Sequence, residues 1–269
     1  MFEILKIVVP ALLGILGGLL SAWFTMRSGY AIKQRERESE ARDKLKLQYL
    51  DPLRVATQDL RDRLIEIRER QNRKDTLLTD TIQQLKSNKC GHLASNALYN
   101  FWRNEVEFSA WANDIGCFAL STLRITALYF YRASKMLKEL PYVELSVGQD
   151  VELRSYLINV KRSLGGPYGV WHELQDSLGE YLVDGDNKIK NYKDFCYEIF
   201  DDKSYYWFIR LITFFQDFHL KTDDEVNNMI QSLNTLDSFL KDRIPKIAQF
   251  NQNIKPRFSP NIRVHRAIR

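Results

Sequence analysis

The order of apolar and polar positions divides the chain into one uninterrupted apolar stretch and a long series of amphipathic segments. The apolar stretch is residues 7–26, twenty consecutive residues without a charge. As an α-helix it would be about 30 Å long, which matches the hydrocarbon thickness of a bilayer. Pro10 falls in its first turns, where a missing amide donor is tolerated, and Trp23 falls near its far end, where an indole suits the headgroup level. The pattern predicts a transmembrane helix.

A cleaved signal peptide is the alternative interpretation of this stretch. Signal peptides carry positive charge ahead of a shorter apolar region and end in small residues. Here Lys6 is the one basic side chain before the stretch, and the bulky Trp23 and Phe24 close it. We therefore expect a retained single-pass anchor that contacts the lipid bilayer through residues 7–26.

The flanking charges predict the orientation of this anchor. Basic residues resist translocation, so the more basic flank stays in the cytoplasm. Lys6 and the amino terminus precede the stretch, whereas a run of basic residues follows it closely: Arg27, Lys33, Arg35, Arg37, Arg42, Lys44 and Lys46. The N-terminus should therefore lie outside and the bulk of the chain in the cytoplasm.

The remaining chain separates at two changes of pattern. Charges of both signs follow the anchor without any proline until Asp51-Pro52, where an N-cap residue and a helix-starting proline predict a new helix. After residue 250 the chain is basic and rich in proline. The expected parts are an N-terminal transmembrane anchor (1–26), a charged helical stalk (27–50), an all-α cytoplasmic domain (51–250) and a basic C-terminal tail (251–269).

Apolar residues recur at helical spacing through most of the domain, which predicts a multi-helix bundle. The first helix starts at Asp51, and its apolar stripe is Val55, Ala56, Leu60, Leu64 and Ile67. The other expected helices are 77–85, two within 93–140 that meet at a bend near 113–116, 149–164, 168–182, 192–200, 204–220 and 222–244. A loop is expected at 87–91.

The last helix has the clearest pattern. Thr222 and Glu225 form a capping-box sequence at its start. Its apolar stripe is Val226, Met229, Ile230, Leu233, Leu236, Phe239 and Leu240. The turn signal Asp184-Gly185-Asp186-Asn187 predicts one possible β element, a small hairpin at 181–190.

Composition agrees with an all-α fold. The 269 residues are 45% hydrophobic and include only 12 glycines and 7 prolines, fewer turn residues than an all-β fold needs. The aromatic segment 205–215 is too short to cross a membrane and contains Arg210, so a buried helix is expected there. The three cysteines, Cys90, Cys117 and Cys196, form no CxxC pair, and we expect buried, reduced thiols.

Two short stretches resemble a loose group of bacterial single-pass membrane proteins with helical cytoplasmic parts. The first is Tyr49-Leu50-Asp51-Pro52-Leu53-Arg54, followed by Asp59-Leu60 and Arg63-Leu64, and the second is Gln175-Asp176-Ser177-Leu178-Gly179-Glu180. The resemblance implies a bacterial inner (cytoplasmic) membrane location. It implies no activity and no site residues.

The best candidate for chemistry is the segment after Gly165-Gly166-Pro167. His172, Asp176 and Glu180 are spaced i, i+4, i+8 and share one helical face. An imidazole beside carboxylates can bind a metal or transfer protons. The alternative is an ordinary solvated face, opposite the apolar residues Val170, Trp171, Leu174, Leu178 and Leu182.

Gly179 lies inside the same helix. Glycine there costs up to about 1 kcal/mol relative to alanine, which indicates close helix packing or a partner contact. No cofactor is expected, because no GxxxxGK[ST], GxSxG or HExxH pattern occurs. Cys90 and His92 lack a second pair of ligands at zinc-site spacing.

Two further features suggest partners. Gly14, Gly18 and Ala22 form a small-residue face on the expected membrane helix, which predicts a possible homo-oligomer. The C-terminal tail is basic, so contact with anionic lipid is expected and nucleic acid is the less favoured polyanion. Its basic residues are Lys255, Arg257, Arg263, Arg266 and Arg269.

These features favour a non-enzymatic function. The leading hypothesis is a membrane-tethered helical interaction or sensor module that brings a protein partner to the cytoplasmic membrane surface. The second is an oligomerising membrane effector of a bacterial stress or phage-defence system. The third is an enzyme or metal site that uses His172, Asp176 and Glu180.

Overall fold

The computed structural model describes residues 46–90, 105–140, 148–166, 169–185 and 188–242, together with individual positions between 21 and 40. The chain divides into two compact units, Met1–Gln48 and Tyr49–Arg269. In the first unit the described positions are helical. The Thr25 hydroxyl there donates to the Ser21 carbonyl at 2.8 Å, and the Arg27 guanidinium lies 5.1 Å from the centre of the Trp23 ring.

Among the described residues, no helix combines the length and apolar character that a membrane crossing needs. Most of the expected anchor, including Gly14, Gly18 and Ala22, lies outside the described residues, and so does the whole tail 251–269. The membrane helix, its small-residue face and the lipid-binding tail therefore stay predictions.

The second unit is all-α, as expected. The helices described are η1 (Lys46–Leu50, a π-helical turn that begins in the first unit), α2 (Asp51–Asn72), α3 (Leu77–Cys90), α4 (Glu105–Asn113), α5 (Cys117–Glu139), α6 (Gln149–Ser163), α7 (His172–Glu180), α8 (Tyr192–Phe200), α9 (Asp202–Gln216), the 3-10 turn η3 (Asp217–Leu220) and α10 (Asp223–Asp242). No strand occurs in the described part. The expected hairpin is a single antiparallel bridge between Val183 and Ile189.

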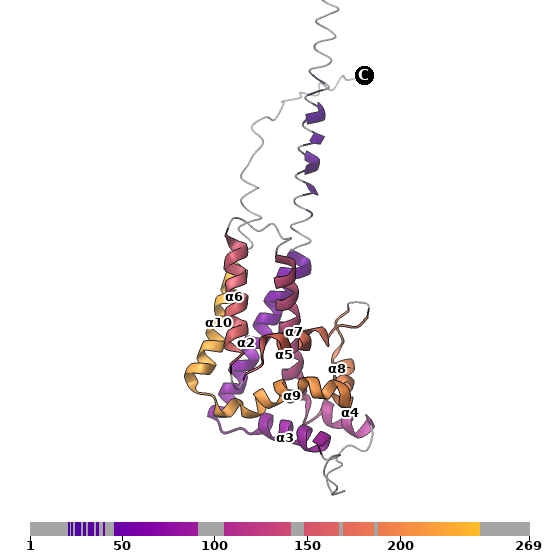
Figure 1. Ribbon diagram of the computed structural model, residues 1–269, viewed down its shortest axis with the longest axis vertical. Coiled ribbons are helices and arrows are strands. Elements are labelled where there is room, and N and C mark those ends of the chain that lie inside the picture. The colour runs from indigo at the N-terminus through magenta and orange to yellow at the C-terminus, as the bar shows by residue number, and fades with distance from the viewer. Residues whose placement is uncertain are drawn as a thin grey trace, which may run out of the picture. The chain divides into compact units, whose positions relative to one another are not determined.

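The long helices α2, α5, α6 and α10 run along one another, while α3, α7 and α9 cross them (Figure 1). Helix α5 packs against α2 on one side and α7 on another, and α10 packs against α2 and α6. Helix α9 packs on α3 and α8 at one end of the bundle. Its aromatic side chains fill the core there, and the fully or almost fully buried ones are Tyr205, Phe208, Phe214 and Phe215.

The burial of side chains in α10 and α2 confirms most of the apolar stripes predicted for them. All seven stripe residues of α10 are buried, from Val226 to Leu240. In α2 the stripe holds except at Val55, which is 48% exposed, because Leu53 takes the buried position one turn before Ala56. A buried carboxylate joins these two helices: Asp237 accepts from Gln58 at 3.0 Å, from Arg61 at 2.9 Å and from Lys241 at 2.9 Å.

Two expected boundaries and one expected helix cap were wrong. The segment 87–91, expected to be a loop, is helical as far as Cys90, the last residue of α3. Asp51 makes no capping bond, since the preceding Leu50 already has a helical backbone. The helix expected from 168 begins only at His172, because Gly166 adopts a left-handed conformation (φ 93°) and Trp171 is extended.

Candidate functional site

Helix α7 lies unusually close to α5, and Gly179 is the reason. A Cβ placed on Gly179 would lie 2.5 Å from the backbone nitrogen of Tyr131 and 2.7 Å from its Cα. Only glycine leaves room for this backbone approach, since α5 cannot move a main-chain atom as it would a side chain. The close helix packing expected from the sequence is confirmed.

The candidate face of α7 is tied to its neighbours by ion pairs. Asp176 accepts from Lys161 of α6 at 2.6 Å, and Glu180 accepts from Lys138 of α5 at 2.9 Å. The hydrogen bond from Lys138 to Glu180 raises the pKa of that lysine. His172 is exposed at the start of the helix. Such partly exposed pairs contribute roughly 0–1 kcal/mol each, so they orient α7 more than they stabilise it.

The structure does not bring His172, Asp176 and Glu180 together as a ligand set. Within the described ranges, no group of three or more His, Cys, Asp or Glu side chains is placed to hold a metal ion. The Cys90 side chain and all of His92 lie outside the described residues. Asp176 and Glu180 do, however, line the same groove.

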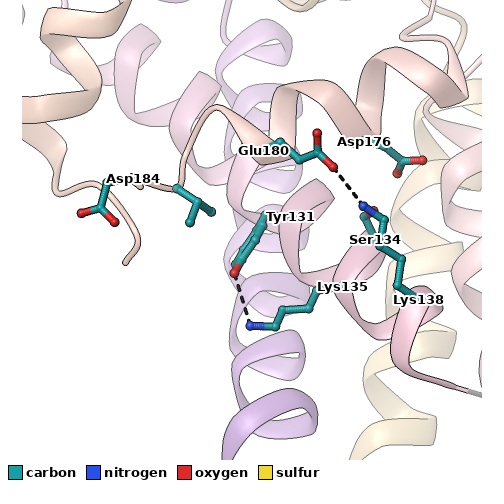
Figure 2. Close-up of a pocket in the computed structure, with 8 residues that line it drawn as sticks. Tyr131, Ser134, Lys135, Lys138, Asp176, Glu180 and Asp184 are labelled. Atoms are coloured by element: carbon teal, nitrogen blue, oxygen red, sulfur yellow. Dashed lines mark hydrogen bonds and ion pairs between the residues drawn. The ribbon is translucent and has the colours of Figure 1, made fainter. Parts of the chain in front are cut away.

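This groove lies between α5 and the end of α7 and has a volume of about 400 Å³. Figure 2 shows α5 side chains forming one wall and α7 carboxylates the other. Lys135 lies 3.4 Å from the Tyr131 hydroxyl and 5.6 Å from the ring centres of both Tyr49 and Tyr131. The groove residues are Tyr131, Ser134, Lys135, Lys138, Asp176, Glu180, Val183 and Asp184.

The turn that precedes α7 is the second feature of this region. The buried Gln175 fixes this turn, because its amide donates to the carbonyl of Val170 at 2.7 Å and to that of Lys161 at 3.0 Å. Arg210 of α9 donates to the Gly169 carbonyl at 2.9 Å. Its guanidinium also lies 5.8 Å from the centre of the Trp171 ring. The turn therefore holds Trp171 against α9.

Large aromatic side chains are exposed around Arg210. Trp171 is 63% exposed, Tyr206 57% and Trp207 50%. Tyr206 and Trp207 precede Arg210 by four and three residues, so all three share one face of α9. Tyr181 contacts Trp207 with ring centres 6.1 Å apart. We call Trp171, Tyr181, Tyr206, Trp207 and Arg210 the aromatic surface.

The sequence pattern missed this surface. Trp171 was expected on the buried stripe of a helix, but the later start of α7 leaves it in extended backbone and exposed. The segment 205–215 was expected to be buried, yet only one side of α9 is. The spacing of Tyr206, Trp207 and Arg210, on the side of the helix opposite Phe208, is the sequence signal that could have predicted the exposed side of α9.

Cys196 and Cys117 differ in their exposure to solvent. Cys196 is buried, and burial raises the pKa of its thiol to about 11. Cys117 is exposed at the start of α5, so the expectation of a buried thiol was wrong there. Cys117 is the first residue of α5, after the N-cap Gly116.

Comparison with protein-family models, with curated proteins and with solved structures found no match for the chain. The resemblance to bacterial single-pass proteins therefore stays an expectation from two short stretches.

Proposed function

We propose that the chain is a membrane-tethered helical module that docks a protein partner through the aromatic surface, without catalysing a reaction. The observation that carries this proposal is the exposure of Trp171 and Trp207 beside Arg210. Trp, Tyr and Arg are the residues most enriched where protein interfaces concentrate their binding energy. A rigid helical scaffold presents all three types together here.

The energy available at this surface is large. A tryptophan exposed by 50–63% leaves roughly 100 Å² of mostly apolar area in water. At about 25 cal/mol per Å², covering each indole contributes about 2.5 kcal/mol. The neighbouring Arg210 holds Trp171 in place before binding, which lowers the ordering cost of association.

The ion pairs of α7 favour docking over catalysis. A general acid or base must be free to exchange a proton with a substrate. Asp176 and Glu180 are each held by a lysine, at 2.6 and 2.9 Å. An enzymatic role for His172, Asp176 and Glu180 is thus the weaker candidate.

Co-purification of the full chain from detergent-solubilised membranes tests the docking. Trp171→Ala with Trp207→Ala should weaken retention of the partner by at least about 30-fold, because truncation of even one interface hot spot costs about 2 kcal/mol. Val151→Ala is the matched control, since Val151 is an exposed apolar residue on α6 (67%). Retention that is equal in the double variant and the control would remove the proposal.

We place the module at the inner membrane of a bacterium, with residues 7–26 as the anchor. The uncharged length of this stretch and the basic residues after it support this placement. After alkaline extraction the full chain should stay in the membrane pellet, and a chain lacking residues 1–26 should be released. Release of the full chain would contradict the anchor.

The oligomerising effector is the second candidate, and the sequence Gly14, Gly18 and Ala22 supports it. Gly14→Ile with Gly18→Ile should lower the yield of crosslinked dimer in membranes. The same pair of substitutions should leave partner retention by the aromatic surface unchanged if docking does not need assembly.

A further inference from the structure

Two cysteines meet at one tyrosine where helices α4, α5 and α8 contact one another (Figure 1). Cys117 is the first residue of α5, and Tyr192 and Cys196 lie one turn apart on α8. The Tyr192 hydroxyl donates to the Ala112 carbonyl at 2.8 Å, which holds the phenol beside the last turn of α4. Both thiols lie within hydrogen-bonding reach of this hydroxyl, so the two sulfur atoms flank a single oxygen.

The backbone around the two cysteines suits a bond between their sulfur atoms. Helices α5 and α8 approach each other to within 8 Å between Cα atoms. This is close to the separation of about 4.4–6.8 Å that a disulfide spans. Cys117 occupies the first position of α5, where no preceding helical turn restricts rotation about its Cα–Cβ bond. Rotation of this side chain moves its sulfur without any movement of the helix.

The two thiols differ in the way that a two-step oxidation requires. Cys117 is exposed, so a dissolved oxidant reaches it directly. Cys196 is buried, and burial raises the pKa of its thiol to about 11, which keeps it protonated and slow to react with an oxidant by itself. Cys117 is therefore the thiol that reacts first, and Cys196 is the one that waits beside it.

Arg124 supplies positive charge on the buried side of the pair. The Tyr192 hydroxyl and Arg124 both favour the thiolate form of Cys196, against the effect of burial. The Arg124 guanidinium donates from Nη2 to the Lys190 carbonyl at 3.0 Å, whereas its buried Nε has no hydrogen-bond partner in the described part of the chain. Negative charge that develops on Cys196 during an attack on Cys117 would be stabilised by this guanidinium.

We propose that Cys117 and Cys196 form a reversible, peroxide-sensitive disulfide in which Cys117 is oxidised first and Cys196 resolves it. Hydrogen peroxide transfers an oxygen to the Cys117 sulfur, its O–O bond breaks, and water leaves, so that Cys117 becomes a sulfenic acid. The Cys196 sulfur then attacks the Cys117 sulfur. The S–S bond forms, the S–O bond breaks, and the hydroxyl leaves as water with the Cys196 proton. A dithiol reductant restores both thiols and is itself oxidised to a disulfide.

This modification site gives the module a redox input. Disulfides that form in a reducing compartment are usually transient and redox-sensing. The new bond would join α5 to α8, the helix on which α9 packs. No residue of the aromatic surface takes part in the chemistry, so the site stands apart from partner docking.

Peptide mass mapping of the full chain in detergent micelles, after exposure to excess hydrogen peroxide, tests the pair. Cys90 is closer to Cys117 in the sequence than Cys196 is, so an unfolded chain should favour the shorter loop between Cys90 and Cys117. We expect the folded chain to yield at least about tenfold more Cys117–Cys196 link than any link that includes Cys90. The preference should reverse when the chain is unfolded in urea before oxidation, and dithiothreitol should remove the link.

Variants then separate the two steps. Cys196→Ser leaves the Cys117 sulfenic acid without a resolving thiol, so dimedone, which reacts with sulfenic acids, should label Cys117 at least about fivefold more than in the wild type. Cys90→Ser is the matched control and should keep the full yield of the Cys117–Cys196 link. A dominant link through Cys90, a link between the Cys117 residues of two chains, or equal dimedone labelling of Cys117 in wild type and Cys196→Ser would each overturn the proposal. These measurements need no partner, so they succeed or fail independently of docking by the aromatic surface.

Discussion

Replacing Gly179 by alanine should destabilise the helical domain. The added Cβ would lie 2.5 and 2.7 Å from backbone atoms of Tyr131 and 3.0 Å from the carbonyl carbon of Phe130. Overpacking of a core contact costs about 1–3 kcal/mol, and main-chain neighbours place this site at the upper end. Alanine returns about 1 kcal/mol through its better helix propensity. The net loss is therefore about 2 kcal/mol, which lowers the Tm of a domain of this size by about 4–8 °C.

Thermal unfolding of the full chain in detergent micelles, followed by far-ultraviolet circular dichroism, measures this effect. Gly185→Ala is the matched control, because a Cβ at Gly185 meets no atom within 4 Å and its backbone is not left-handed. The control should shift stability by no more than about 0.5 kcal/mol. If Gly179→Ala unfolded at or above the wild-type Tm, α7 would not lie against the α5 backbone, and the groove and the turn carrying Trp171 would be wrongly placed.

Three further outcomes are expected. Asp237→Ala should lower the free energy of unfolding by about 3 kcal/mol in urea titrations, because the almost buried carboxylate of Asp237 accepts from three donors. A loss below about 1 kcal/mol would contradict these three interactions. Hydrogen bonds from the Thr222 backbone and side chain lower the pKa of Glu225, so its stabilisation is complete above the unfolded pKa near 4.5 and is lost as pH falls through the folded value. The Tm advantage of wild type over Glu225→Gln should therefore shrink between about pH 6 and pH 3, and a constant difference would refute the capping box. Iodoacetamide at about pH 7.5 should alkylate the exposed Cys117 much faster than the buried Cys196 in the folded chain, as peptide mass mapping would show, and equal rates would contradict their placement.

Features set by neighbours in the sequence could be predicted. The capping box at the last helix is present: the Thr222 amide donates to Glu225 at 2.8 Å, and the Glu225 amide donates to the Thr222 hydroxyl at 3.3 Å. The apolar stripe that follows is buried, since a 3.6-residue period assigns the inner face without reference to other helices. Gly179 was also informative, because a glycine inside a helix needs a reason that outweighs its cost.

Features set by residues that are distant in the sequence could not be predicted. The lysines that pair with Asp176 and Glu180 come from α6 and α5, at separations of 15 and 42 residues. Sequence spacing showed that the carboxylates share a face but gave no sign of what they meet. The exposure of Trp171 depends on the turn before α7 and on Arg210 of α9, which no local period describes.

Site-specific photocrosslinking in living cells tests whether the aromatic surface binds a protein. A benzoylphenylalanine replaces Tyr206, which is 57% exposed on this surface, and in a parallel strain replaces Val151 on α6. We expect a discrete adduct from position 206 that is lost when Trp171→Ala and Trp207→Ala are added, and none from position 151. No adduct from position 206, or one that persists unchanged in the double variant, would contradict it.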